Sequence, residues 1–256
     1  MLDAVWRIGS RVRRSGALTI PAAVAVIAFA AACSSDTGPE GTVEVSGAPV
    51  TVGNGTAHAF VVTAPGGMSS IGVALSPSAL NGLPSVDSMW DLPLPAGSAA
   101  APWDHVEINW NVQGHPPAMY MLPHFDFHFY SVSRSEQASV QPGPDTVTVP
   151  AANVPTDYIS GVEAVPDMGV HWVDTTSAEF HGQTFDHTLI YGFYHGKMMF
   201  IEPMVTRTFL AGHPDVTAPV KQPQQFQTAG RYPTYYSVKT ASDGTIRVSL
   251  DSLTQR

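Results

Sequence analysis

The sequence predicts an all-β fold, mainly an antiparallel sandwich or a barrel-like sheet, with one to three short helices. Two observations support this prediction. Short runs rich in Val, Thr and aromatic residues are separated at close spacing by Gly and Pro, of which the chain has 22 each. One of these runs, residues 123–130, alternates strictly between polar and apolar side chains, which is the period of a β-strand.

The expected strands succeed one another from residue 42 to residue 250. They are 42–46, 57–63, 70–75, 104–110, 124–133, 145–149, 168–174, 186–195, 198–205, 233–240 and 245–250. Asp243-Gly244 predicts a hairpin turn, and Gly196-Lys197 predicts another. Short helices are expected at 76–82, which has a Ser-Pro start and an Asn-Gly stop, at 206–211 and near 221–228.

Residues 1–33 predict a bacterial lipoprotein signal peptide. Four arginines and one acid are followed by an uncharged stretch, from Ser15 to Ala32, that is rich in Ala, Val and Ile. A basic start, a short apolar run and small residues before the break are typical of a secretory signal. The break falls at Cys33, which we expect to be acylated after export, although Ala30 replaces the usual Leu. The alternative is an ordinary cleaved signal and secretion.

After the signal we expect a flexible tether at 34–41 and a single mainly-β domain at 42–256, within which 42–100 can form an N-terminal subdomain. Four of the 12 Lys+Arg and one of the 21 Asp+Glu lie in the signal, which leaves 8 basic and 20 acidic residues and a net charge of −12. This charge argues against nucleic acid as a partner and against direct docking on anionic lipid. The expected location is therefore extracytoplasmic, with membrane contact through the lipid on Cys33.

Several enzyme classes are excluded by what the chain lacks. It contains no Gly-x-Ser-x-Gly elbow, phosphate-binding loop, Rossmann glycine pattern or His-Glu-x-x-His segment. Because Cys33 is the only cysteine, its acylation leaves no thiol for a disulfide or for nucleophilic catalysis.

The most informative segment is Pro-His-Phe-Asp-Phe-His-Phe-Tyr at residues 123–130. One face of this strand carries three phenylalanines, which we expect in the core. The other face carries ligand-type side chains: His124, Asp126, His128 and Tyr130. Residues two apart on a strand lie about 6.6 Å apart and those four apart about 13 Å, so His124 and His128 are not expected to share one metal ion. Either can share an ion with Asp126.

A third ligand is expected from a neighbouring strand, where His171 lies in the β-pattern of residues 169–174. Imidazole and carboxylate together suit a divalent transition metal, zinc first, with iron, manganese and copper as alternatives. Two histidines and one carboxylate with open positions can activate water, whereas four closed ligands make a structural site. Without a metal, the same row would be a buried polar network, a small-molecule cleft or a solvated strand face.

Further candidates surround this strand. Glu202 lies among apolar residues and must be paired, protonated or bound to a cation, so it is a candidate ligand or general base. If the hairpin turns at Gly196-Lys197, Tyr191 lies across from Glu202 and can hydrogen-bond to it. His195 beside that turn is expected to be exposed, although the mouth of a cleft would also fit. His115, in a Gly-His-Pro-Pro loop, is a candidate additional ligand.

The strand expected at 104–110 has its own polar face. His105, Glu107 and Asn109 alternate with Val106 and other apolar residues. We expect this polar face to be exposed to solvent.

Five segments form a recognisable pattern in this order: Gly-His-Pro-Pro (114–117), Pro-His-Phe-Asp-Phe-His-Phe-Tyr (123–130), Gly-Val-His-Trp (169–172), Tyr-Gly-Phe-Tyr-His-Gly (191–196) and Phe-Ile-Glu-Pro (200–203). Together with shorter stretches between residues 53 and 95, they resemble an uncharacterised family of secreted bacterial proteins, a domain of unknown function. The resemblance spans nearly all of 50–256. It implies an extracytoplasmic, mainly-β domain and no particular activity.

A weaker similarity is to α-type carbonic anhydrases, in which a strand with His-x-His lies beside a strand bearing a third histidine. The corresponding residues here are Asp126, His128 and His171, with an aspartate in place of the first histidine. The Thr-Glu pair of those enzymes has no counterpart that can be placed here, so the similarity is an analogy.

The sequence thus supports two hypotheses and leaves open whether the protein is an enzyme. The first is a metal-binding β domain on the outer side of the membrane, with an ion that could activate water for hydrolysis or hydration. The second is a non-catalytic binding or envelope module. In that case the His-Asp-His-Tyr face would be a cleft for a small-molecule ligand or a contact in a homo-oligomer.

Overall fold

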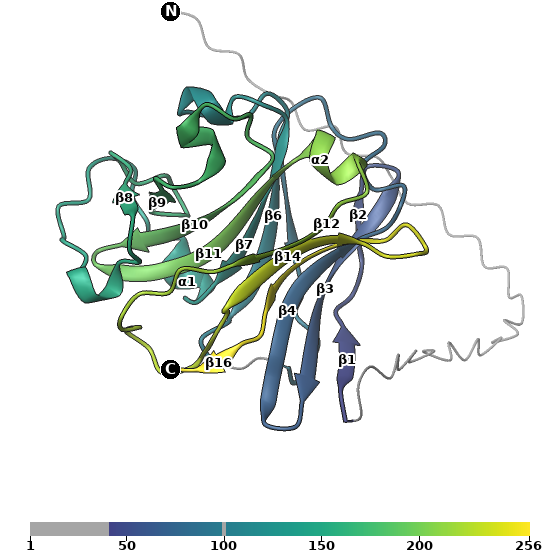
Figure 1. Ribbon diagram of the computed structural model, residues 1–256, viewed down its shortest axis with the longest axis horizontal. Helices are drawn as coiled ribbons and strands as arrows, with labels where there is room; N and C mark the ends of the chain where they lie inside the picture. Colours follow the sequence, from purple (N-terminus) through teal and green to yellow (C-terminus); the bar gives the residue numbers. More distant parts are fainter. Residues whose placement is uncertain (1–40, 99–100) are drawn as a thin grey trace, which may run out of the picture. The chain divides into compact units, whose positions relative to one another are not determined.

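A computed structural model describes residues 41–98 and 101–256 (Figure 1). The signal peptide, Cys33 and residues 34–40 of the expected tether lie outside the described residues. Among the helices of the described part, none has both the length and the apolar character needed to cross a membrane.

The fold consists of two large antiparallel sheets. Sheet 1 has the strand order β1 (Val43–Ser46), β3 (Gly55–Ala64), β4 (Gly67–Leu75), β15 (Ile246–Asp251), β14 (Tyr235–Thr240) and β12 (Asp215–Pro219), with β2 (Val50–Val52) also paired to β3. Sheet 2 has the order β5 (Ser88–Leu92), β6 (His105–Asn111), β7 (His124–Tyr130), β11 (Lys197–Thr206), β10 (His187–Tyr194), β9 (Val170–Asp174) and β8 (Tyr158–Ser160). A separate ladder joins β13 (Arg231–Tyr232) to β16 (Thr254–Gln255).

Helical segments in the described residues are short. They are α1 (Arg134–Gln137), α2 (Arg207–Ala211) and three 3₁₀ turns, Ala118–Tyr120, Ala151–Asn153 and Ala178–His181. Helix α1 begins with a capping box, in which the Ser133 side chain accepts from the Glu136 backbone and the Glu136 carboxylate accepts from the Ser133 backbone. The Thr206 side chain caps α2, which lies where the sequence predicted a helix.

One face of β7 lies in the core between the sheets. Phe125, Phe127 and Phe129 have no exposed surface and belong to the same buried cluster as Val73 and Val248 of sheet 1. This confirms that the phenylalanine face is core. Figure 1 shows β6, β7, β10 and β11 side by side in sheet 2.

The opposite face of sheet 2 is also buried. The segments that connect its strands carry Tyr120, Val132, Val140, Ala164 and Phe185, which form a second apolar cluster with side chains from that face. The histidine row of β7 therefore lies beneath a layer of connecting segments.

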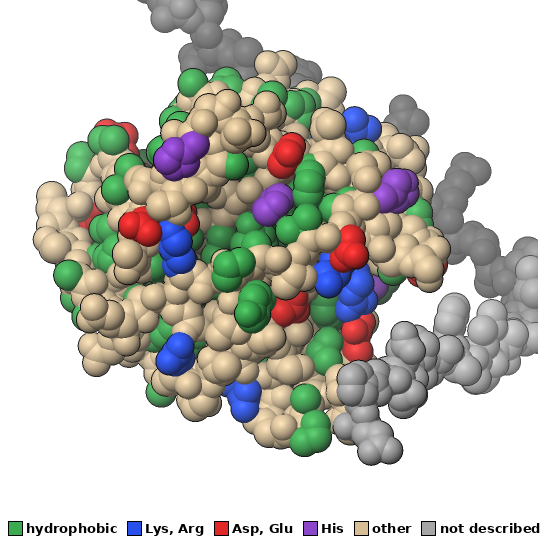
Figure 2. All heavy atoms as spheres, in the orientation of Figure 1, with side chains coloured by type: hydrophobic (Ala, Val, Ile, Leu, Met, Phe, Trp, Pro, Cys, Tyr) green, Lys and Arg blue, Asp and Glu red, His purple; other side chains and the backbone are tan. Residues whose placement is uncertain are grey.

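Figure 2 shows that, on the face in view, acidic and basic side chains are interspersed and form no patch of one sign.

The all-β prediction is confirmed, and in the described residues the two sheets form an open sandwich in which neither sheet closes into a barrel. Some element predictions are wrong. Residues 145–149 form no strand, 76–82 form turns, and 221–228 form no helix. The strands β2, β5, β8, β12, β13 and β16 were not predicted, because they are five residues long or less and give too few positions for an alternating pattern.

The hairpin between β10 and β11 turns one residue earlier than predicted. His195 and Gly196 form the two-residue loop, with φ of 49° and 76°, the left-handed conformation that such turns require. A β-bulge then shifts the register, so that Tyr191 lies opposite Ile201. The expected Tyr191–Glu202 pair is therefore wrong, because residues opposite Ile201 point to the other face of the sheet.

Candidate metal centre

Six side chains beneath the connecting segments form two groups, each with two histidines and one carboxylate. The outer group is His115, His124 and Asp126, and the inner group is His128, His171 and Glu202. Within each group, the nitrogen and oxygen atoms that could bind an ion all lie within 4.8 Å of one another.

The sheet brings the inner group together from three strands. In the β7–β11 register Phe200 lies opposite Tyr130, which puts Glu202 opposite His128. His171 comes from β9, on the far side of β10 from β11. The alternation of β7 then places His124 and Asp126 further along the same face, where His115 approaches from the loop before the first 3₁₀ turn.

In the outer group, hydrogen bonds to backbone carbonyls fix the imidazole tautomers. His124 Nδ1 lies 2.6 Å from the Leu122 carbonyl and His115 Nδ1 lies 2.9 Å from the Pro116 carbonyl. A carbonyl oxygen only accepts, so each Nδ1 carries the proton and each Nε2 of the neutral rings has a free lone pair. Those lone pairs face Asp126, with His124 Nε2 3.0 Å from Oδ1 and His115 Nε2 3.6 Å from Oδ2.

The Asp126 carboxylate is held in its charged form. Burial tends to raise its pKa, but contacts with His115 and His124 outweigh burial and lower the pKa below its usual range. Asn111 Nδ2 also donates to Asp126 Oδ2 at 2.6 Å. For His115 burial lowers the pKa, but the Asp126 carboxylate more than compensates, so the net shift is upward.

In the inner group both histidines face one carboxylate oxygen. Glu202 Oε2 lies 3.5 Å from His128 Nε2 and 3.6 Å from His171 Nε2, distances too long for hydrogen bonds of this type. When metal–ligand bonds are about 2.0–2.2 Å, neighbouring donors of a tetrahedral shell are roughly 3.3–3.6 Å apart. The donor spacing of the inner group thus matches the edges of a metal coordination shell.

The inner group is buried in uncharged form. The side chains of His128 and Glu202 are 0% and 1% exposed, and that of His171 is 20% exposed. Burial lowers the pKa of His128 to about 3 and that of His171 to about 4. Burial also raises the pKa of Glu202 well above its ordinary value, and the negative charge of Asp126 adds to that increase.

One aromatic ring contacts both inner histidines. The Phe200 ring packs edge-on against His128 and His171, with centroids 4.7 Å and 5.4 Å away. It lies over Gly192 of β10, where a Cβ atom would come within 2.2 Å of the ring. Glycine at 192 therefore makes room for the ring that fixes both imidazoles.

Unpartnered polar atoms are concentrated on this face. In the described residues, eight buried side-chain nitrogen or oxygen atoms lack a hydrogen-bond partner. Seven of them belong to Asn109, His124, Asp126, His128 and Glu202. Buried polar groups are normally hydrogen-bonded, and each orphan costs about 1–3 kcal/mol, so this cluster is the place where a bound cation would stabilise the protein most.

The structure divides the ligand set that the sequence suggested. Asp126 and His124 come together with His115, which the sequence indicated only as a secondary candidate. His128 and His171 come together with Glu202. The trio suggested by the carbonic anhydrase analogy is thus split between two groups.

Three other candidates belong to neither group. The Tyr130 hydroxyl donates to the Asp167 carbonyl at 3.1 Å. Tyr191 lies in the core between the sheets and donates to the Lys221 carbonyl at 3.0 Å. The His195 side chain is 62% exposed in its turn, as expected.

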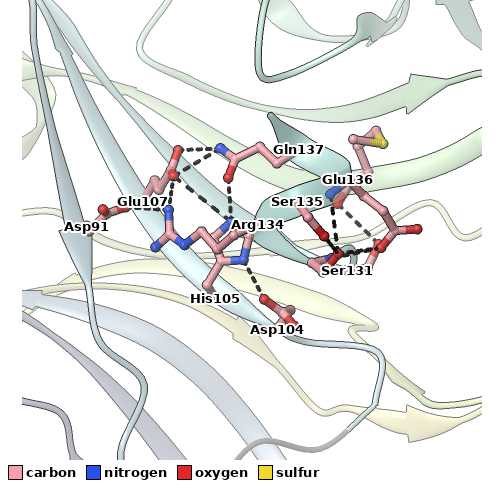
Figure 3. A network of polar contacts seen from close by, with 11 residues as sticks. Asp91, Asp104, His105, Glu107, Ser131, Arg134, Ser135, Glu136 and Gln137 are labelled. Atoms are coloured by element: carbon pink, nitrogen blue, oxygen red, sulfur yellow. Dashed lines mark hydrogen bonds and ion pairs between the residues drawn. The ribbon is translucent and has the colours of Figure 1, made fainter. Parts of the chain in front are cut away.

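The polar face of β6 is not exposed, and that expectation is wrong. His105 and Glu107 are 6% and 3% exposed because α1 covers them. Gln137 of α1 donates to both Glu107 oxygens, at 3.0 Å and 2.9 Å, and Arg134 forms an ion pair with the same carboxylate (Figure 3). The His105 ring stacks on Tyr130, with 4.6 Å between centroids. This satisfied network contrasts with the unpartnered groups beside it.

Residues 64–110 match a family described as "TTHB210-like: Hypothetical protein TTHB210". The matched segment contains β4 and β5 and nearly all of β6, and ends before the first residue of either group. No curated protein and no solved structure matches the chain. Over residues 64–110 the chain is therefore similar to an uncharacterised protein family, which carries no assigned activity.

Proposed function

We propose that this protein is an exported, membrane-anchored lipoprotein whose β-sandwich binds divalent transition metal ions at the outer and inner groups. The signal-like residues 1–33 and the single Cys33 support the export and the anchor. The two His₂–carboxylate groups support metal binding.

One observation carries the metal proposal: ligand atoms approach one another without forming hydrogen bonds. His124 Nε2 and Asp126 Oδ1 are 3.0 Å apart, yet neither has a hydrogen-bond partner. Because Nδ1 of the His124 ring carries the proton that it donates to the Leu122 carbonyl, Nε2 of the neutral ring has no proton to donate to Asp126. Two facing lone pairs instead call for a shared cation. In the inner group, both ring nitrogens of His128 and both carboxyl oxygens of Glu202 are likewise buried without a hydrogen-bond partner.

The donor types indicate which ions are suited. Each group offers two imidazole nitrogens and one carboxylate, with no thiolate. This set fits Zn²⁺ best and also accepts Fe²⁺, Mn²⁺ and Cu²⁺. With three protein donors, a tetrahedral ion keeps one position for water or another ligand.

Burial bears on whether the ions are held or used for catalysis. The side chains of His115 and His171 are 34% and 20% exposed, whereas the other four ligand side chains are at most 5% exposed. In each group, solvent therefore reaches the ligands mainly at one histidine. This limited access favours a site that holds an ion over one that catalyses the reaction of a large substrate. A second candidate function, activation of water toward a small ester or carbon dioxide, is compatible with the exposed edge at these two histidines.

Metal content tests the proposal. The full chain is expressed without a tag in a bacterial host, extracted from membranes in detergent, and incubated with Zn²⁺, Cu²⁺, Mn²⁺ and Fe²⁺ in turn. Mass spectrometry should then find two ions per chain, one for each group. Less than about 0.1 equivalent of every metal would contradict the proposal.

Substitutions assign the ions to the groups. Asp126→Ala should lose the outer ion and Glu202→Ala the inner ion, each leaving the other bound. His58→Ala is the matched control, because His58 lies on β3 in sheet 1. Equal metal loss in Asp126→Ala and His58→Ala would argue against the assigned site.

The anchor has a separate test. Cys33→Ser should prevent incorporation of labelled fatty acid and move the protein from the membrane fraction to the soluble extracytoplasmic fraction. A Cys33→Ser protein that remains labelled and membrane-bound would contradict the lipoprotein assignment and leave the metal proposal intact.

A further inference from the structure

Strand β6 places two asparagines beside the outer group. In the β6–β7 register Asn109 lies opposite Asp126 and Asn111 lies opposite His124. Residues directly opposite one another share a face of the sheet, with Cβ atoms about 4.5–5.5 Å apart. Both asparagine side chains are therefore within reach of the outer group.

The two asparagines differ in how their polar atoms are used. Asn111 donates through Nδ2 to Asp126 Oδ2 at 2.6 Å and so orients the carboxylate. Asn109 Oδ1 is buried and has no hydrogen-bond partner. It is the one unpartnered buried atom of the cluster that belongs to neither group of three. An acceptor in this position needs a donor or a cation.

From the register and the unpartnered oxygen we propose that Asn109 is a fourth ligand of the outer group, binding the ion through Oδ1. This inference rests on the proposed metal binding and extends it. The outer ion then has four protein donors, two imidazole nitrogens and two oxygens, which is a closed set for a tetrahedral ion. The inner ion, with three donors, keeps the open position.

The second oxygen donor also affects which ions are preferred. Amide and carboxylate oxygens are hard ligands suited to Mn²⁺, whereas imidazole suits Zn²⁺ and Cu²⁺. Asn109 therefore shifts the preference of the outer group toward Mn²⁺ relative to a set of two histidines and one carboxylate. Removing the amide oxygen should weaken Mn²⁺ binding more than Cu²⁺ binding.

Two variants of the full chain test the assignment, both in a His171→Ala background that disables the inner group. Asn109→Leu keeps the size of the side chain and removes the oxygen, whereas Asn109→Asp keeps an oxygen donor. Competition titrations with Zn²⁺ and Mn²⁺ should show a loss of affinity of about tenfold or more for Asn109→Leu. The affinity of Asn109→Asp should be retained or increased.

A second measurement separates ligation from a structural role. In chelator-treated protein, Asn109→Leu should unfold at the same or a higher temperature, because it removes an unpartnered buried oxygen. A structural hydrogen-bonding role predicts a lower unfolding temperature for both Asn109→Leu and Asn109→Asp, together with unchanged metal affinity in the folded variants, and that pattern would overturn the inference.

The unsubstituted protein provides a test that does not depend on the variants folding. A crystal structure with Zn²⁺ bound should place Asn109 Oδ1 about 2.0–2.2 Å from the outer ion. A bound outer ion with Oδ1 more than about 3 Å away would overturn the role of Asn109 alone. If the folded His171→Ala protein bound no metal, the outer site itself would be refuted, and this inference with it.

Discussion

Both faces of β7 are buried, but one face is apolar and the other carries ionisable side chains. Phe125, Phe127 and Phe129 are 0% exposed and pack between the sheets, while His124 and Asp126 on the other face are 0% and 4% exposed. Burying the phenylalanines is favourable in itself, because it removes apolar surface from water. Burying the polar row costs free energy unless each atom finds a partner.

Burial alone therefore does not distinguish structural polar residues from candidate ligands. On β6, the neighbouring Glu107 is as buried as Asp126, but Arg134 and Gln137 satisfy its carboxylate. The polar row of β7 is not satisfied in this way. A strand face that is buried, polar and short of hydrogen bonds is best explained by a ligand that supplies the missing charge.

The largest expected effect tests the apolar face. Phe127→Ala should lower the free energy of unfolding by about 3–5 kcal/mol, because it leaves a cavity between the sheets. Urea denaturation measures this change. Val162→Ala, at a position 89% exposed, is the control and should stay within about 0.5 kcal/mol. A negligible loss for Phe127→Ala would show that the faces of β7 are reversed.

The next effect is the pH dependence of the metal-free protein. Burial lowers the pKa of His128 to about 3 and of His171 to about 4. As the pH falls from about 6.5 to 4.5, the unfolded chain therefore binds up to two protons at these residues that the folded state does not, and stability falls as pH falls. Glu202 opposes this change, because its raised pKa keeps it protonated in the folded state while the unfolded carboxyl ionises.

The net difference at these three residues is one proton, or about 1.4 kcal/mol per pH unit. Urea denaturation with a chelator present, at several pH values, checks the slope. Glu202→Met should make the slope steeper, because it removes the opposing contribution. Stability that is flat or rises from pH 6.5 to pH 4.5 would contradict the assigned protonation states.

A smaller effect is expected from removing the buried carboxyl itself. Glu202→Met should raise the stability of the metal-free protein by about 1–3 kcal/mol, because two unpartnered oxygens are replaced by an apolar group of similar volume. The same variant should lose stabilisation by Zn²⁺ at the inner group. Thermal unfolding with and without Zn²⁺ measures both changes, and a strongly destabilised metal-free variant would show that Glu202 contributes to the fold without metal.

The smallest effect is expected outside both groups. His195 adopts a positive φ in an exposed turn, a conformation that asparagine tolerates well. His195→Asn should change stability by at most about 0.5 kcal/mol and leave metal stoichiometry unchanged. Loss of a bound ion in this variant would mean that the centre extends to the turn.

Features that depend on periodicity could be predicted from the sequence. The alternation of residues 123–130 was enough to place β7 and to separate its two faces. The spacing of His124 and His128 was enough to assign them to different groups of side chains. The alternation of side chains and the rise of about 3.3 Å per residue are local properties of any strand, so both predictions needed no knowledge of its neighbours.

Features that depend on contacts between distant segments could not be predicted. The bulge in β11 places Tyr191 on the opposite face of the sheet from Glu202, and no local pattern signals it. The burial of His105 and Glu107 depends on α1, which lies in the connection after β7. His115 joins the outer group because its loop folds back over the sheet. The only sequence signal for this position was that the loop closely precedes β7.

Anomalous X-ray diffraction from crystals of the Zn²⁺-incubated protein tests most directly whether the polar face of β7 binds metal. Data collected on either side of the zinc absorption edge should show two anomalous peaks, one among His115, His124 and Asp126 and one among His128, His171 and Glu202. Well-ordered crystals with no peak at either group, and with these six side chains in the same positions, would contradict the claim.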